Sequence, residues 1–364
     1  MADERKELMH PAEATPGMAA VHRRRFTKPD GRELFLYGYS PHEGATVGAC
    51  LDGGPKEAAL RWHPLRGEWS VYAAGRQNRT FRPTTAEDPL APMVPGGPPT
   101  EIPFADFELA VFENRFPSFS LDAQEVPSPP GTGTAPAIGR CEVVVYTPEE
   151  TGSLATLSQE RRELLVRVWT DRYEALFGAG AAFVMPFENR GDAVGVTLPH
   201  PHGQIYAFPV IPKIQETSLA AFHNGQFNFA EKMSQWGDYV LTKMNSVVAF
   251  APPFARFPYE VWIAPAERRA GPWEMTADEI SGFAHLLGEV TRRYDNFFEC
   301  ETPFMLSLQA APRGSEHVWH FWAQFFPLLR AKDKLKYLAS VEQATGLFTV
   351  DVPPEETVRA LRDR

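Results

Sequence analysis

Two histidines, separated by a single residue, carry the strongest chemical signal in this sequence of 364 residues. His200 and His202 stand in the stretch P-H-P-H-G-Q, residues 199–204. In an extended backbone, residues i and i+2 point to the same face, so both imidazoles would face one site. The two prolines fix φ and remove backbone donors, which stiffens the segment. This pattern favours a reactive site; the alternative is a pair of ordinary histidines in a proline-rich turn.

The chemistry that these side chains predict is the transfer of a phosphoryl-type group through nitrogen. A neutral imidazole is a nucleophile, and later a leaving group, when its other nitrogen donates to a fixed acceptor. Gly203 allows another group to come close to the backbone. Gln204 supplies a neutral amide that can donate to a phosphoryl oxygen. We therefore expect a phosphoramidate intermediate on this segment.

The H-P-H-G-Q segment resembles that of the galactose-1-phosphate uridylyltransferase family, a branch of the histidine triad superfamily. In the hydrolases of that superfamily a third histidine usually stands where this chain has Gln204. The resemblance implies that His202 attacks the α-phosphorus of a UDP-sugar, holds UMP covalently and passes it to a second sugar 1-phosphate. His200, a metal ligand in metal-bearing relatives, would hold the strand and orient the ring of His202 through its backbone carbonyl.

The same resemblance implies which residues hold the substrates. The nucleotide-binding positions are Arg76, Arg79, Phe112, Asn114, Asn189, Gly195 and Thr197. The hexose-phosphate positions, which belong to the partner subunit in the family, are Lys336, Tyr337 and Glu342. Without the resemblance, the arginines could be solvated surface residues, Phe112 a core residue, and residues 334–342 a charged amphipathic helix.

The metal sites of the family are not matched in this chain. The zinc-ligand positions are held by Ala91, Val94, Glu150 and His200. The positions of the second metal, usually iron, are held by Gln309, Trp322, Gln324 and Ser218. Because a zinc site needs about four ligands, mostly Cys or His, we expect neither metal and no other cofactor.

The composition indicates a globular protein with an acidic surface. A hydrophobic content of 43% supports a sizeable core, and a net charge of -10 with a pI near 5.6 argues against a nucleic-acid partner. The charged N-terminus and the lack of a long apolar run predict no membrane segment. Cys50, Cys141 and Cys300 are odd in number and far apart, which is typical of free thiols, so we expect a cytoplasmic protein.

The elements that position the histidines follow from hydrophobic periodicity. Strands are predicted over residues 31–37, 61–72 as a hairpin, 107–117, 141–146, 183–189, 205–208, 247–250, 261–264, 305–310 and 319–326. Helices are predicted over 159–177, capped by Thr156 and Gln159; over 280–298, capped by Thr276 and Glu279; within 213–245; and after residue 351. The proline- and glycine-rich run 88–103 is expected to be a loop.

This order predicts an α+β fold of two fused histidine-triad-like halves, with mainly antiparallel sheets and packed helices. The expected limits are a disordered N-terminus over 1–25, an N-terminal domain with the catalytic motif over 26–212, and a C-terminal domain over 213–364. The family further implies a homodimer.

The predicted activity is transfer of UMP between UDP-glucose and galactose 1-phosphate by a ping-pong mechanism. One alternative is a related transferase or phosphorylase for a different nucleotide or sugar 1-phosphate. A second alternative is a nucleotide-binding protein without catalysis.

Overall fold

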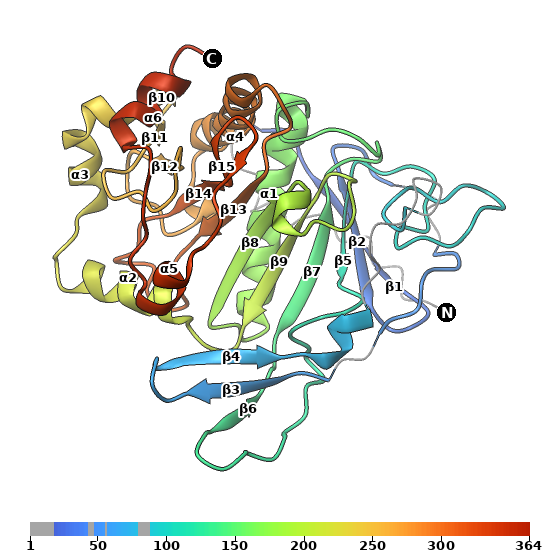
Figure 1. Ribbon diagram of the computed structural model, residues 1–364. Coiled ribbons are helices and arrows are strands. Elements are labelled where there is room, and N and C mark those ends of the chain that lie inside the picture. The colour runs from blue at the N-terminus through green and yellow to red at the C-terminus, as the bar shows by residue number, and fades with distance from the viewer. Residues whose placement is uncertain (1–17, 43–46, 55–56, 79–87) are drawn as a thin grey trace.

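The protein, seen in a computed structural model, is built on one eleven-stranded antiparallel sheet (Figure 1). The structure describes residues 18–42, 47–54, 57–78 and 88–364. Across the sheet, the strands are β1 (His22–Thr27), β2 (Glu33–Gly38), β5 (Leu109–Glu113), β7 (Arg140–Val145), β9 (His202–Phe208), β8 (Phe183–Arg190), β13 (Phe304–Gln309), β14 (Trp322–Pro327), β12 (Val261–Pro265), β11 (Val247–Phe250) and β10 (Val240–Met244). Among the described residues, no helix is long and apolar enough to cross a membrane.

The middle of this sheet is made of two halves with the same plan. β5, β7, β9 and β8 of the first half mirror β11, β12, β14 and β13 of the second, and β8 pairs with β13 where the halves meet. A long helix precedes the central hairpin in each half: α1 (Gln159–Gly178) and α4 (Ala277–Phe298). The expected α+β fold of two fused halves, with mainly antiparallel sheets and packed helices, is thereby confirmed.

The long helices α1 and α4 pack against each other and against one face of the sheet (Figure 1). Thr276 and Glu279 form the predicted capping box of α4. The predicted cap of α1 was wrong: Ser158 is its N-cap and accepts from the backbone of Arg161, whereas Thr156 closes the preceding turn by bonding to Ser153. Both residues are good caps, and the turn at Ser153 decides between them.

Aromatic rings fill the opposite face of the second half. Trp262 and Trp322 stack with ring centroids 5.1 Å apart, beside Trp319. The segment 213–245 contributes α2 (Lys213–His223) and α3 (Phe229–Gln235) to this side. The helical prediction for 213–245 was wrong at residues 240–244. They form the edge strand β10, which pairs with β11.

The N-terminal strand begins earlier than expected. β1 starts at His22, inside the segment 1–25 that was predicted to be disordered, and pairs along its length with β2. Alternation in H-R-R-R-F-T is hidden by three consecutive arginines, of which Arg23 pairs with Asp171 of α1 and Arg25 with Glu33 of β2. The predicted boundary between the two domains, at residues 212 and 213, stays a prediction.

Smaller elements complete the fold. These are the sheet of β4 (Glu68–Tyr72), β3 (Ala59–His63) and β6 (Thr134–Pro136); the pair β15 (Leu329–Ala331) and β16 (Lys334–Leu335); the helices α5 (Ser340–Thr345) and α6 (Pro354–Leu361); and the 3-10 turns η2 (Ala74–Asn78), η4 (Asp192–Val194), η5 (Gly237–Tyr239) and η6 (Pro272–Glu274).

Candidate active site

His202 is the first residue of β9, a strand in the interior of the sheet. Its Nδ1 atom lies 2.7 Å from the backbone carbonyl oxygen of His200. A carbonyl oxygen only accepts, so Nδ1 carries the hydrogen and Nε2 keeps its lone pair. Burial lowers the pKa of the His202 imidazole below its ordinary value of 6.5. The ring is therefore neutral at pH 7, as a nucleophile must be.

Gln204 follows His202 on the same face of β9. The strand alternates, with Gly203, Ile205 and Ala207 turned into the core. The side-chain oxygen of Gln204 accepts from the Nδ2 atom of Asn114 at 3.3 Å. This contact assigns the amide orientation and leaves the NH₂ group of Gln204 as a donor beside His202.

His200 is anchored on both sides of its ring. Its Nδ1 lies 2.7 Å from Oδ2 of Asp88 and its Nε2 lies 2.8 Å from the carbonyl oxygen of Thr147. Since the carbonyl only accepts, Nε2 carries a hydrogen, and a further proton must lie between Nδ1 and Asp88. The side chain of His200 is 0% exposed. These two contacts fix the position of His200, and with it the backbone carbonyl group that orients His202.

The residues present do not fit the zinc site of the family. Both ring nitrogens of His200 are occupied by protein partners, and Glu150 and Val94 lie exposed to solvent. Within the described residues, no group of three or more His, Cys, Asp or Glu side chains is arranged to hold a metal ion. At the second metal site, Gln309 bonds to Gln215, Gln324 bonds to Glu260 and Trp322 is stacked. The absence of both metals from the protein in solution stays a prediction.

Gly203 is required by close packing behind the site. A Cβ atom there would lie 2.3 Å from the hydroxyl oxygen of Tyr146 and 2.9 Å from the carbonyl oxygen of Phe187. That hydroxyl donates to Glu188, whose pKa is raised by burial to about 7. The close approach expected at Gly203 thus involves the protein's own core.

Two cavities meet at His202. The first, which we call the Gln204 cavity, is lined by Leu51, Arg76, Pro89, Leu90, Glu101, Phe112, Asn114, Arg115, Phe116, Val143, Thr197, Leu198, His202 and Gln204. The second, the Asn189 cavity, is lined by Gly152, Ser153, Glu188, Asn189, Arg190, Gly191, Asp192, Val196, Thr197, Leu198, Pro199, His200, Pro201, His202 and Glu301. An extended ligand can therefore pass His202 from one cavity to the other.

Most of the expected nucleotide-binding residues lie around these cavities. Arg76, Phe112, Asn114 and Thr197 line the Gln204 cavity, and Asn189 lines the Asn189 cavity. Arg79 lies outside the described residues.

Three of the expected nucleotide-binding residues are not freely available to contact a ligand. Gly195 ends η4 with a φ of 74° and lines neither cavity, so it shapes the loop. Phe112 is 2% exposed and offers little ring surface. Arg76 already donates to Tyr206 and to the carbonyl group of Phe116.

The expected hexose-phosphate residues are not brought to His202 within one chain. Lys336 and Glu342 form an ion pair at 2.5 Å, and the second oxygen of Glu342 accepts from the backbone of Ala339. Lys336 lowers the pKa of Glu342 to about 2. Tyr337 is 75% exposed. Neither cavity includes any of the three.

Several residues at the site were missed by the sequence reasoning. Asp88 stands at the start of the proline-rich run 88–103, and its only signal was that it is one of two acidic residues in that run. Glu101 is the other, and Glu188 lies within a strand. A partner that is distant in the chain leaves no local pattern.

Family models match the two halves in turn. The model for the N-terminal domain of galactose-1-phosphate uridyl transferase matches residues 55–212, and the model for its C-terminal domain matches residues 214–339. The chain belongs to the galactose-1-phosphate uridylyltransferase family.

Individual uridylyltransferases agree with this membership. The chain is 37% identical to the galactose-1-phosphate uridylyltransferase of Thermotoga maritima over 319 residues, covering 84% of this chain and 98% of the relative. It is 32% identical to that of Streptomyces lividans over 360 residues, covering 92% and 95%.

Solved structures share the fold of this chain. A uridylyltransferase superposes with a TM-score of 0.75 at 26% identity, covering 84% of this chain and 97% of the other. An ADP-glucose phosphorylase from Arabidopsis thaliana, at 19% identity and a TM-score of 0.64, covers 84% of this chain and 99% of its own and shares the fold.

Proposed function

We propose that this uridylyltransferase moves UMP between UDP-glucose and galactose 1-phosphate through a covalent intermediate on His202. Nε2 of His202 attacks the α-phosphorus of UDP-glucose, a P–N bond forms, and the bond to the bridging oxygen breaks. Glucose 1-phosphate leaves with that electron pair. A phosphate oxygen of galactose 1-phosphate then attacks the same phosphorus, breaks the P–N bond and leaves as UDP-galactose, while His202 becomes neutral again.

The observation that carries this proposal is the contact from Nδ1 of His202 to the carbonyl oxygen of His200. It fixes which nitrogen is free and which way the ring faces. Positive charge that develops on the imidazole during attack is stabilised by the same carbonyl dipole. The amide of Gln204, held by Asn114, is placed to donate to a non-bridging oxygen of the phosphoryl group.

We further propose that the enzyme works as a homodimer in the cytoplasm, without a metal. Lys336, Tyr337 and Glu342 lie away from their own chain's cavities, which is what a contribution to a partner's site requires. In that complex the sugar phosphate would compete with Glu342 for the ammonium group of Lys336. The three cysteines are free thiols, in agreement with a reducing compartment.

Isotope exchange tests the proposed ping-pong order. The enzyme should exchange labelled glucose 1-phosphate into UDP-glucose when no galactose 1-phosphate is present, because the first half-reaction is complete by itself. The His202→Ala variant should show no exchange, and His317→Ala, at an exposed histidine, should exchange as the wild type does.

The outcomes separate the alternatives. Exchange that requires ADP-glucose in place of UDP-glucose would identify a transferase for another nucleotide. Binding of UDP-glucose without any exchange would identify a binding protein.

A further inference from the structure

An N-terminal segment outside the region matched by the family models builds part of the Gln204 cavity. The models begin at residue 55. β1 and β2 precede that point, and β2 pairs with β5, so this hairpin extends the catalytic sheet. The chain after β2 then brings Leu51 to the cavity wall. One end of the cavity therefore depends on residues that the family models do not describe.

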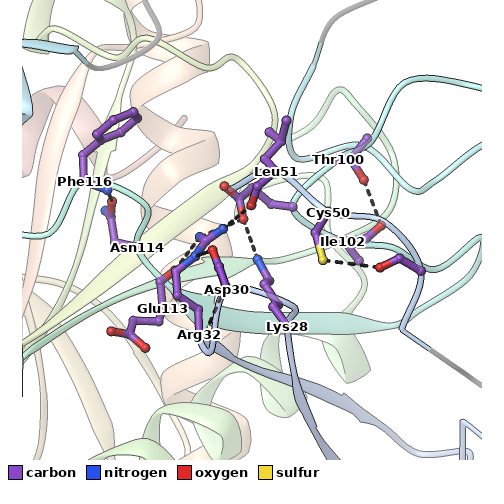
Figure 2. A network of polar contacts seen from close by, with 12 residues as sticks. Lys28, Asp30, Arg32, Cys50, Leu51, Thr100, Ile102, Glu113, Asn114 and Phe116 are labelled. Carbon is purple, nitrogen blue, oxygen red and sulfur yellow. Dashed lines mark hydrogen bonds and ion pairs between the residues drawn. The ribbon is translucent and has the colours of Figure 1, made fainter. Parts of the chain in front are cut away.

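A buried cluster of charges contacts the backbone of Leu51 (Figure 2). Nζ of Lys28 donates to Oε2 of Glu101 at 2.5 Å, and Nη1 of Arg32 donates to the same oxygen at 2.9 Å. The side chains of Lys28, Arg32 and Glu101 are 0%, 1% and 5% exposed. Asp30 and the carbonyl group of Leu51 hold the other end of Arg32.

Packing alone does not explain why these three charged side chains are buried together. Removing charged groups from water is unfavourable, and well-packed apolar residues often serve stability equally well. Burial lowers the pKa of Lys28, and the attraction of Glu101 opposes that shift. The two cations are thus committed to holding one carboxylate in a single orientation.

The carboxylate of Glu101 has one oxygen that neither Lys28 nor Arg32 holds. Both hydrogen bonds from Lys28 and Arg32 go to Oε2, and Oε1 has no partner among the described residues. Glu101 lines the Gln204 cavity, and its side chain is 5% exposed. Nε of Arg115, on the same wall, is a buried donor that also has no partner in the described part of the chain.

The sheet register gives the direction of a bound nucleotide. Phe112, Val143 and Gln204 are direct neighbours on β5, β7 and β9. Neighbouring strands lie about 4.8 Å apart, so Phe112 is about 10 Å from Gln204 across the sheet. That is the scale of a ribose with its base. With the α-phosphorus at His202, a base at that distance reaches Phe112, and Glu101 lies near it because Nζ of Lys28 contacts both the ring of Phe112 and the carboxylate of Glu101.

We propose that Glu101 selects uracil by accepting the N3–H of the base on its free oxygen, with Lys28 and Arg32 as positioning residues. A carboxylate can only accept. Uracil donates at N3, whereas cytosine, a ring of the same size, presents a lone pair there and would face the carboxylate acceptor to acceptor. The inference rests on the proposed function, which supplies a UDP-sugar as the ligand.

The test compares the binding of UDP-glucose and CDP-glucose by titration calorimetry. We expect the wild type to prefer UDP-glucose. Glu101→Gln should weaken UDP-glucose binding about 10- to 100-fold, the size of a lost charge-assisted hydrogen bond. It should also reduce the preference over CDP-glucose, because a carboxamide can donate to N3 of cytosine. Asp106→Asn, at an exposed carboxylate in the same stretch, is the matched control and should change neither value.

A methylated ligand and a double variant serve as further controls. N3-methyl-UDP-glucose should bind weakly to the wild type and lose little more in Glu101→Gln, since both changes remove one contact. If Glu101→Gln alone does not fold, Lys28→Met with Glu101→Gln removes the unpaired buried charge and allows the same comparison.

The possible failures can be told apart. An unchanged UDP-over-CDP preference in Glu101→Gln would overturn the role of Glu101, as would a wild type that binds CDP-glucose or ADP-glucose as tightly as UDP-glucose. Labelling of His202 by UDP-glucose is measured in the same samples. Labelling without dependence on Glu101 refutes base selection alone, and base selection without labelling refutes the covalent mechanism alone.

Discussion

The carbonyl oxygen of His200 lies 2.7 Å from Nδ1 of His202, and its position is fixed because the ring of His200 is itself held by Asp88 and Thr147. The ring of His202 is therefore oriented by a backbone group whose own side chain is buried and held by two hydrogen bonds. The family resemblance implies that metal-bearing relatives use the histidine at this position as a ligand. Here a carboxylate and a carbonyl group hold the ring instead.

Removing the carboxylate of Asp88 should loosen this arrangement. Asp88→Ala is expected to lower the free energy of unfolding by about 1.5–3 kcal/mol, since a buried hydrogen bond to a charged group is lost. It should also slow uridylylation. Asp88→Asn should retain most of the stability and most of the uridylylation rate, because its amide group can donate a hydrogen bond to Nδ1 of His200. Urea unfolding and single-turnover loading measure the two effects. Equal losses in both variants would show that the negative charge is essential.

The pH dependence of loading should follow the neutral form of His202. Burial lowers the pKa of this imidazole below 6.5, so protonation removes the nucleophile only at more acidic pH. The rate of the first half-reaction should be flat near pH 7 and fall as the pH falls, with a midpoint below 6.5. Rapid-quench loading at saturating UDP-glucose measures it. A midpoint at or above 6.5 would contradict the assigned environment.

The amide of Gln204 should matter more for the transition state than for binding. Gln204→Ala is expected to reduce kcat by about 100-fold, as the loss of one donor to a developing oxyanion does in other enzymes, with a small change in KM. Asn114→Ala should have a smaller effect, because it only releases the amide. The double variant should lose less than the two single losses combined. Additive losses would mean that the two side chains act independently.

A methyl group at Gly203 should not fit. Gly203→Ala would place Cβ 2.3 Å from the hydroxyl oxygen of Tyr146 and 2.9 Å from the backbone of Phe187. We expect a loss of about 1–3 kcal/mol in stability, as overpacked cores show. In the Tyr146→Phe background the loss should be smaller, since one of the two contacts is gone. Thermal unfolding of the four proteins decides; an equal loss in both backgrounds would place the strain at Phe187.

Glu188 should make stability fall as the pH rises. Its pKa is raised by burial from 4.5 to about 7, so the folded protein holds this proton more tightly than the unfolded chain. The contribution is complete below pH 4.5 and is lost as the pH rises towards 7, by about 3 kcal/mol at 1.36 kcal/mol for each pKa unit. Glu188→Gln should remove this slope. Unfolding at pH 5 and pH 7.5 tests it, and parallel slopes would exclude Glu188 as the source.

Local patterns in the sequence were enough to predict the fold and the arrangement of the two histidines, whereas the role of His202 as nucleophile stays a prediction. H-P-H-G-Q depends on residues that are close in the chain, and the expected contact from the His200 carbonyl group to the ring of His202 is present. The cap of α4 follows from Thr276 and Glu279 alone, a spacing that is visible in the sequence. These features need no knowledge of distant partners.

What could not be predicted depends on contacts between distant segments. Asp88 lies 112 residues from His200, and Glu101 lies 73 residues from Lys28. Strand β10 follows two helices without a change in composition that would mark it, and its pairing with β11 decides its conformation. The N-cap of α1 depended on a turn at Ser153 that competes for Thr156.

Mass spectrometry of the protein after acid-free denaturation of a reaction with UDP-glucose tests the central claim most directly. We expect one added uridylyl group, located on His202 by peptide mapping, released by acid and discharged by galactose 1-phosphate. His202→Ala should gain no mass. A wild-type protein that binds UDP-glucose in the same sample but stays unmodified, or a uridylyl group on a different residue, would refute a covalent intermediate on His202.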